Sequence, residues 1–147
     1  MILLIAVPLG LFIIAKTLFE INNGNASRKW STTQGVVTHS GEFTTHRVSD
    51  GIMRKSTSSF FQYEYTVNGE KQIGTRIFFG DFFLSMIGIN AGKKYAAGYE
   101  IGQTVTVYYK PSKPADSVLL PGVKNLVYAG FAAGMGVIAA GFLLLYI

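Results

Sequence analysis

The stretch FQYEYTVNG, residues 61–69, decides the fold of the central part of the chain. Apolar and aromatic residues at positions 61, 63, 65 and 67 alternate with polar ones, which is the period of two that a half-buried strand requires. Asn68-Gly69 suits a tight turn with positive φ at both positions. We therefore predict a β-hairpin made of residues 60–67 and 71–79.

Further strands are predicted on both sides of this hairpin. β-branched and aromatic residues favour strands at Thr33–Ser40 and Thr104–Tyr109, and a shorter one at Ser117–Leu120. Gly41–Ser58 is polar and mixed in charge, which predicts a long hairpin loop or a poorly ordered extension. Residues 30–122 are thus expected to form a small, mainly antiparallel β-sandwich or barrel-like domain.

An apolar segment lies at each end of the sequence. Residues 126–147 contain no charged side chain, and a helix of that length would span about 33 Å, enough for a hydrocarbon core of roughly 30 Å. We predict transmembrane helices at residues 1–21 and 123–147, with a linker at residues 22–29. The fold class is therefore an α+β membrane protein in which two transmembrane helices flank the β domain.

The first helix is uncharged as far as Ala15, and Lys16 would extend its ammonium group to the membrane interface. A cleaved signal peptide is the alternative interpretation. No basic residue precedes the apolar stretch and no clear small-x-small cleavage site follows it, so an uncleaved anchor is favoured.

The distribution of basic residues predicts the orientation. All 13 Lys and Arg residues lie between the two predicted helices. Because cytoplasmic segments are enriched in Lys and Arg, the β domain is expected on the cytoplasmic face of a bacterial inner membrane, with both termini outside.

Composition excludes several classes of protein. Charged residues make up only 14% of the chain and hydrophobic residues 49%, whereas an average soluble domain is about 25% charged. The chain has no cysteine, which excludes disulfide scaffolds, thiolate zinc sites and cysteine nucleophiles. The net charge of +5 is explained by membrane topology, although it also suits an anionic surface.

Small residues follow one side of the second predicted helix. Gly130 and Gly134 form a Gly-x-x-x-Gly pair, which Ala133 and Gly141 extend. Such a surface allows another helix to approach closely in lipid. The first helix of the same chain, a second copy and a foreign subunit are all candidate partners.

Apolar residues crowd into Ile77–Ile89. A hydrophobic core for the β domain explains them, because a domain of this size still needs an interior. The alternative is a surface for a partner or for the bilayer, with Phe82, Phe83 and Ile87 in contact and Lys93 and Lys94 meeting anionic headgroups.

No motif predicts catalysis or a cofactor. A hydrolase would need His39 or His46 as its base, and neither lies in a recognisable context. His39, Glu42, His46 and Asp50 lie close in sequence, but strand and loop spacing does not make them converge on a metal. The cations are scattered along the chain, which argues against nucleic-acid binding. We expect no enzyme activity, no metal and no cofactor.

The order of motifs across residues 30–122 resembles one family. The motifs are Trp30, Gly35-Val36-Val37, the stretch 63–69, Arg76-Ile77-Phe78-Phe79-Gly80, the stretch 99–111 that ends in Tyr109-Lys110-Pro111, and Ser117-Val118-Leu119-Leu120-Pro121-Gly122. They resemble the domain-of-unknown-function family 3592, whose members place a small β domain beside or between membrane helices. The resemblance implies this architecture and no established activity.

These observations favour a non-enzymatic accessory or scaffold subunit of a bacterial inner-membrane complex. Its partners would be the lipid bilayer and another membrane protein or a second copy of itself, and not nucleic acid. The alternative is a membrane binding module, either an immunity-type protein that holds a toxin or a sensor of a small ligand.

Overall fold

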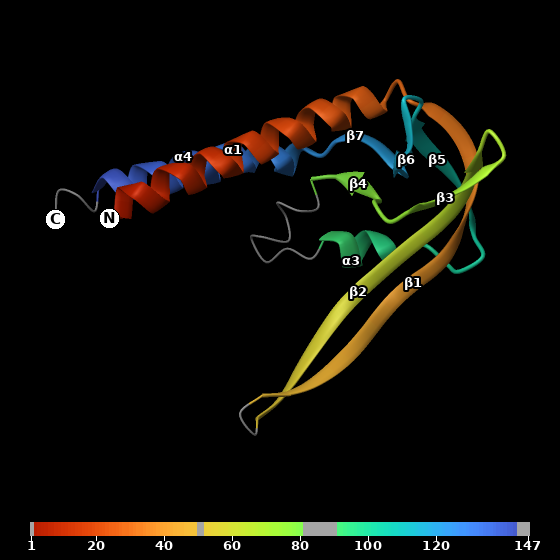
Figure 1. Ribbon diagram of the computed structural model, residues 1–147, viewed down its shortest axis with the longest axis horizontal. Helices are drawn as coiled ribbons and strands as arrows, with labels where there is room; N and C mark the ends of the chain where they lie inside the picture. The colour runs from red at the N-terminus through yellow and green to blue at the C-terminus, as the bar shows by residue number, and fades with distance from the viewer. Residues whose placement is uncertain (1, 50–51, 81–90, 144–147) are drawn as a thin grey trace. The chain divides into compact units, whose positions relative to one another are not determined.

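The computed structural model describes residues 2–49, 52–80 and 91–143 (Figure 1). The chain divides into two compact units. The sheet unit comprises Trp30–Ile77 and Asn90–Leu120, and the helical unit comprises Met1–Lys29, Phe78–Ile89 and Pro121–Ile147. Each unit is described below by itself.

The sheet unit is built on a five-stranded antiparallel sheet. Its strands are β1 (Ser31–Ser49), β2 (Ile52–Val67), β3 (Glu70–Gly74), β5 (Thr104–Lys110) and β6 (Lys113–Val118), in the spatial order β3-β2-β1-β5-β6. The edge strands β3 and β6 contact each other, so the sheet curls on itself. Within the described residues this is one curled sheet with the short helix α3 (Ala91–Ala96) beside β2, closer to the barrel-like alternative than to a sandwich of two sheets.

The predicted hairpin turn is present between β2 and β3. Asn68 has φ 52° and Gly69 has φ 84°, the positive values that a type I′ turn requires. The second strand ends at Gly74, earlier than the predicted residue 79. The ring of Tyr63 occupies the space where a side chain at position 74 would lie, and the chain leaves the sheet there.

Alternating residues of β2 form the core of the sheet unit. Phe61, Tyr63, Tyr65 and Val67 are all buried. The Tyr63 hydroxyl donates to the Arg76 carbonyl oxygen at 3.0 Å. Because its proton is used there, the Ser117 hydroxyl, 2.9 Å away, donates to the Tyr63 oxygen.

A second tyrosine crosses the curl in the same way. The Tyr65 hydroxyl donates to the Pro114 carbonyl oxygen at 2.6 Å, so both tyrosines join β2 to β6 across the inside of the sheet. The strands β1, β5 and β6 each contribute one fully buried valine: Val37, Val107 and Val118. The alternation seen in the sequence therefore marks the concave, core-facing side of the curl.

The predicted strand Ser117–Leu120 is divided between two strands. β6 ends at Val118, and β7 (Leu120–Val123) begins two residues later and pairs with β4 (Phe78–Phe79). The amides of Leu119 and Leu120 both donate to the Ile77 carbonyl oxygen, at 3.2 and 2.7 Å. Because the two amides share one acceptor, the chain bends between the end of β6 and the start of β7.

The stretch 41–58 was expected to be a loop or a poorly ordered extension, but its described residues, 41–49 and 52–58, continue the two central strands. β1 and β2 remain paired from Gly41 opposite Phe60 as far as Ser49 opposite Ile52. A bulge between Val37 and His39 marks the point where the long ribbon leaves the sheet (Figure 1).

The helical unit contains two long helices and the short strands β4 and β7. α1 runs over Ile2–Ser27, and a 3₁₀ turn, η1 (Asn125–Tyr128), leads into α4 (Ala129–Leu143). α1 continues through residues 22–27, which we expected to be a linker. Its polar side chains bond within the helix, as when Asn23 Nδ2 donates to the Phe19 carbonyl oxygen at 2.9 Å.

Only one described helix is long and apolar enough to cross a membrane, and not the two that we predicted. It covers Ile5–Ser27 and could be a membrane anchor or a signal sequence. The described part of the second helix, Gly130–Leu143, is apolar but shorter. The predicted span 123–147 begins with the last residue of β7 and the η1 turn, and α-helix starts only at Ala129. Its last four residues lie outside the described part of the chain.

The buried tyrosines predict alkaline sensitivity of the sheet unit. Burial raises the pKa of Tyr63, Tyr65 and Tyr99 above the ordinary value of about 10. A raised folded-state pKa stabilises the fold below the unfolded-state pKa of about 10, and that contribution is lost as the pH rises from there through the folded-state pKa. Chemical denaturation followed by Trp30 fluorescence should show this decline between pH 9 and 11.

The variant Tyr63→Phe should lower stability by about 1–3 kcal/mol at pH 8, because the Ser117 hydroxyl and the Arg76 carbonyl lose their partner. It should also make the alkaline decline shallower. Tyr108→Phe is the matched control, because no hydrogen bond of its hydroxyl is found in the described residues. An identical alkaline slope in Tyr63→Phe and the parent chain would contradict this account.

Candidate functional site

The most extensive contact in the helical unit is between α1 and α4, which lie side by side (Figure 1). A methyl group placed on Gly134 would come within 2.6 Å of Ile14 Cγ1 and 3.1 Å of the Gly10 carbonyl oxygen. A methyl group on Gly130 would collide with the side chain of Thr17. Glycine is therefore required at both positions if the helices are to remain this close.

The contact is reciprocal and antiparallel. Gly10 of α1 lies against Ile138 and the Gly134 carbonyl of α4. Gly10 contacts Ile138, Ile14 contacts Gly134, and Thr17 contacts Gly130, so residue numbers rise along α1 while they fall along α4. The glycines of each helix thus pack against branched side chains of the other helix. The glycine face packs on the first helix of the same chain, one of the three partners considered.

The predicted small-residue face is not uniform. Gly130, Gly134 and Gly141 are buried, and Ala133 is half-buried. Gly136 is exposed, and no atom lies within 4 Å of a side chain placed there. Ala132 and Ala140, four residues before and after it, are exposed as well. α4 therefore carries a second small-residue face that α1 does not cover.

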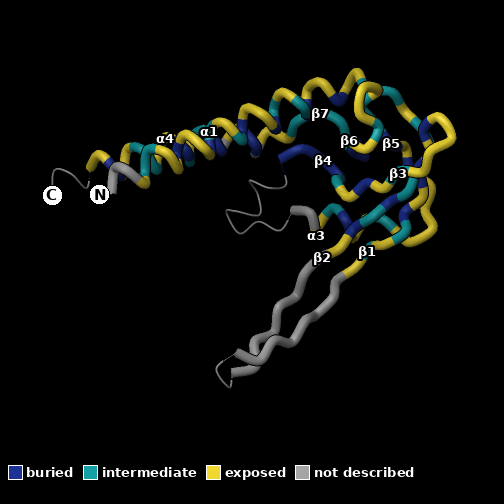
Figure 2. Tube along the Cα trace, viewed as in Figure 1, coloured by how far each residue is buried: buried dark blue, intermediate teal, exposed yellow. Residues whose placement is uncertain are grey.

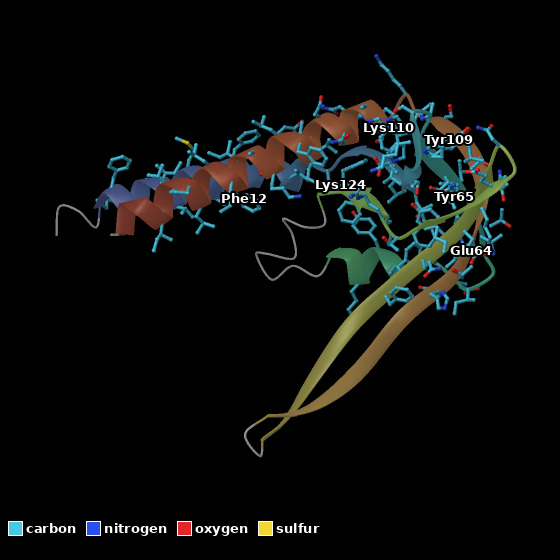
Figure 3. The ribbon with its side chains drawn as sticks, in the orientation of Figure 1. Phe12, Glu64, Tyr65, Tyr109, Lys110 and Lys124 are labelled. Carbon is cyan, nitrogen blue, oxygen red and sulfur yellow. The ribbon has the colours of Figure 1, made fainter. Side chains whose placement is uncertain are left out.

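Large apolar side chains project from the outside of the helix pair. They include Ile5 (66% exposed), Phe12 (54%), Phe19 (56%), Met135 (61%) and Phe142 (51%). Figure 2 shows the exposed residues along both helices, and Figure 3 shows Phe12 among carbon-rich side chains on α1. A surface of this kind is typical of helices that face lipid or another protein.

The last turns of α1 bind β4 and β7 through buried polar side chains. Glu20 is 5% exposed, and its Oε2 accepts a hydrogen bond from the Gly80 amide at 3.0 Å. Gly80 has φ 103°, and a side chain there would collide with Val127. The carboxylate thus satisfies the backbone at the end of β4, where only glycine fits.

Ser27 makes the corresponding contact with β7. Its hydroxyl donates to the Gly24 carbonyl oxygen at 2.6 Å and accepts from the Gly122 amide at 3.0 Å. A side chain at Gly24 would come within 3.2 Å of Phe79 Cβ and 2.6 Å of Val123 Cγ2. Sequence reasoning missed Glu20 and Ser27. The one local sign of this contact in the sequence was Glu20, an acidic residue near the end of an apolar helix.

The start of the apolar run Ile77–Ile89 is buried. Phe78 and Phe79 are each 1% exposed and form β4 in the helical unit. Phe82, Phe83 and Ile87, proposed as partner or bilayer contacts, lie outside the described residues. Lys93 and Lys94 are exposed on α3 of the sheet unit.

Basic side chains lie at the end of α1 and before η1. Arg28, Lys29 and Lys124 are exposed, and Figure 3 labels Lys124 near that end of the helices. Nearer the beginning of α1, the Lys16 ammonium lies 5.6 Å from the centroid of the Phe19 ring, at a distance suited to a cation–π contact. A cation beside an aromatic ring at this level of α1 is typical of a membrane interface.

The residues considered for chemistry do not converge in the described part of the chain. His39 is exposed, with its ring edge-on to Phe60 at 5.4 Å. Glu42 and His46 lie on β1, their side chains are not described, and Asp50 lies outside the described residues. No group of three metal-ligating side chains is found among the residues that were described.

Comparison with known proteins gives the family. A model of the domain of unknown function DUF3592 matches residues 33–124, and the chain belongs to this family. The match covers the sheet unit together with β4, β7 and the approach to η1. No curated protein matches the chain.

The glycine contact predicts a disulfide between the helices. The Thr17 Cβ lies 3.3 Å from a Cβ placed on Gly130, close to the 3.5–4.5 Å of natural disulfides. Because the chain has no cysteine, Thr17→Cys with Gly130→Cys introduces a single pair. Thr17→Cys also removes the Oγ1 and Cγ2 atoms that a side chain at position 130 would meet, so the pair should oxidise almost completely in the purified full chain. Mass spectrometry after thiol alkylation measures the yield.

Gly134→Leu added to this pair should lower the disulfide yield several-fold, because its side chain would overlap Ile14. Gly136→Leu is the matched control and should leave the yield unchanged. Equal yields in both variants would show that the helices do not meet through the glycine face.

Proposed function

We propose that the chain is a non-enzymatic accessory or scaffold protein of a bacterial inner membrane, anchored by a two-helix hairpin that presents the β domain. The observation that carries this proposal is the packing of α1 on α4 through Gly10, Gly130 and Gly134, with large apolar side chains left on the outside. A helix pair of this composition is stable in lipid, where packing and not water expulsion joins helices.

The length of α1 supports a membrane crossing, and α4 packs antiparallel against the same stretch of α1. From Ile2 to Phe19, α1 would extend about 27 Å, close to the hydrocarbon thickness of a bilayer. Because the helices are antiparallel, Tyr128 at the beginning of the α4 segment lies at the level of Phe19. Aromatic residues at this level are typical of the boundary between lipid and water.

The basic residues support a cytoplasmic β domain. Arg28, Lys29 and Lys124 are exposed at the end of the helix pair that leads into the sheet unit. By the positive-inside tendency, this end would lie in the cytoplasm and both termini outside. This arrangement favours an anchor over a cleaved signal sequence, because α1 makes contacts with α4, β4 and β7 along its length.

A partner would meet the helix pair on its outside, because the glycine face is already used. The face formed by Ala132, Gly136 and Ala140 has the small-residue spacing that admits another helix. A partner from a membrane complex would make the chain a scaffold subunit. A toxin held at the membrane, or a small ligand bound by the β domain, would make it a protective or sensing module.

The proposed topology is tested with single cysteines in the cysteine-free chain. Glu70→Cys lies after the β2–β3 turn and is exposed, and Ile147→Cys is at the C-terminus. A membrane-impermeant maleimide added to spheroplasts should label Ile147→Cys at once and Glu70→Cys only after lysis. Labelling of both from the same side would contradict the two-helix crossing.

The accessory role is tested by purifying the full chain from its native membrane in mild detergent, followed by mass spectrometry of what remains bound. A stoichiometric partner should appear, and Gly136→Leu should reduce it at least several-fold while leaving the Thr17–Gly130 cross-link intact. Met135→Leu, a conservative change on a neighbouring exposed position, is the control. A chain that purifies alone, or a partner that Gly136→Leu retains, would contradict the proposed contact.

A further inference from the structure

The outward face of the sheet unit lies opposite to its aromatic core. Side chains alternate along a strand, so the even-numbered residues from 60 to 66 of β2 point outward, while the odd-numbered ones are buried. Strand pairing extends this face to the neighbouring strands: Ile73 of β3 lies opposite Glu64, and Glu64 lies opposite Val36 of β1. Val36 in turn lies opposite Thr104 of β5. One row of outward side chains therefore crosses four strands.

Large apolar side chains are exposed on this face. Val36 is 43% exposed, Phe60 42% and Ile73 54%. The Phe60 ring lies edge-on to that of His39, with the centroids 5.4 Å apart. Among the described residues of the sheet unit, Ile101 is the one other large apolar residue with comparable exposure. Exposed apolar side chains that gather on one face mark an interaction surface.

The two central rows of the face carry no net charge, although the whole chain has a net charge of +5. In the row beside Glu64, Lys71 lies opposite Thr66, and Gln34 lies opposite Thr106. Glu64 and Lys71 are the charged residues of these two rows, and they bond to each other, with Lys71 Nζ 2.5 Å from Glu64 Oε2. The other polar residues are threonine and glutamine. Few charges at the centre of a surface are typical of a protein–protein interface.

The chemistry of the face is complementary to itself. Threonine hydroxyls and glutamine amides both donate and accept hydrogen bonds, so a face made of them can bond to a copy of itself. In a two-fold dimer, Glu64 of one copy can also meet Lys71 of the other, because each contact occurs twice. A strongly acidic or basic partner would find no net charge to match. These properties favour a second copy of the chain as the occupant.

We propose that the outward face of the sheet unit pairs with the same face of a second copy, related by a two-fold axis. Val36 and Ile73 would be buried in the contact. Four strands about 4.8 Å apart and roughly six residues long give a flat area of roughly 400 Å². This is about half of the roughly 800 Å² that each partner contributes to a standard interface.

The small area predicts a dimer that forms only when the copies are held close together. Two chains anchored in one bilayer are confined to it, which raises their effective concentration. The inference therefore rests on the proposed membrane anchoring. It goes beyond that proposal, because it gives the β domain a partner of its own.

The dimer is tested with Val36→Cys in the full chain, reconstituted in liposomes and treated with a short bis-maleimide. Because the chain has no other cysteine, a covalent dimer reports contact between two copies at this position. It should be the major product. Ala97→Cys, exposed directly after α3, is the control and should give a several-fold lower yield.

Two variants of the Val36→Cys chain show whether the face makes the contact. Ile73→Lys should lower the dimer yield several-fold, because it places a charge in the apolar part of the contact. Ile101→Lys is the matched control, the same substitution at an exposed isoleucine elsewhere, and should leave the yield unchanged. Gln34→Lys adds a cation to the face without removing an apolar side chain, and should act like Ile73→Lys. Trp30 fluorescence shows that each variant is folded.

The proposal is overturned if Val36→Cys and Ala97→Cys give equal yields, or if Ile73→Lys and Gln34→Lys leave the Val36 dimer intact. Preferential cross-linking of Val36→Cys to a different protein in native membranes would equally overturn it. Flotation of the liposomes tests the anchoring separately. A chain that floats but gives no dimer overturns this inference alone. A chain that does not float contradicts the anchoring, and the Val36 cross-link in concentrated solution then decides whether the dimer exists.

Discussion

The rest of the helical unit depends on the absence of side chains where α1 meets α4. In lipid, helices gain little from expelling water, so close backbone approach must supply the association. Glycines at positions 10, 130 and 134 provide that approach, and Ile14, Thr17 and Ile138 fill the space that they leave. The same packing leaves Phe12 and Met135 exposed on the outside of the pair, as the proposed membrane crossing requires.

The end of α1 solves a different problem, because it continues beyond its apolar part. Buried polar groups are costly unless they are hydrogen-bonded. Glu20 and Ser27 meet this condition by accepting the amides of Gly80 and Gly122. Each amide belongs to a glycine with positive φ, so the polar side chains of the helix stabilise the turns that end β4 and shape β7. α1 thus combines glycine packing against α4 with buried hydrogen bonds to the ends of β4 and β7.

Local signals in the sequence predicted the features that depend on neighbouring residues. Asn68-Gly69 and the alternation from Phe61 to Val67 predicted the hairpin, and the order of motifs predicted the family that residues 33–124 confirm. Features set by distant residues were not predictable. β3 ends where the Tyr63 ring covers Gly74, and the strand at 117–120 divides where two amides share the Ile77 carbonyl oxygen. Similarly, the Gly-x-x-x-Gly pair predicted a helix contact but left its partner open, since spacing alone does not say which surface will fill it.

The antiparallel contact between α1 and α4 is tested most directly by a distance between their exposed ends. Spin labels at Ile5→Cys and Phe142→Cys, both on the outside of the helices, should give one narrow distance in the full chain in nanodiscs. The distance should match an interaxial separation of about 8–10 Å plus the lengths of the two labels. A broad distribution, or a narrow one far beyond this range, would contradict the glycine-packed hairpin.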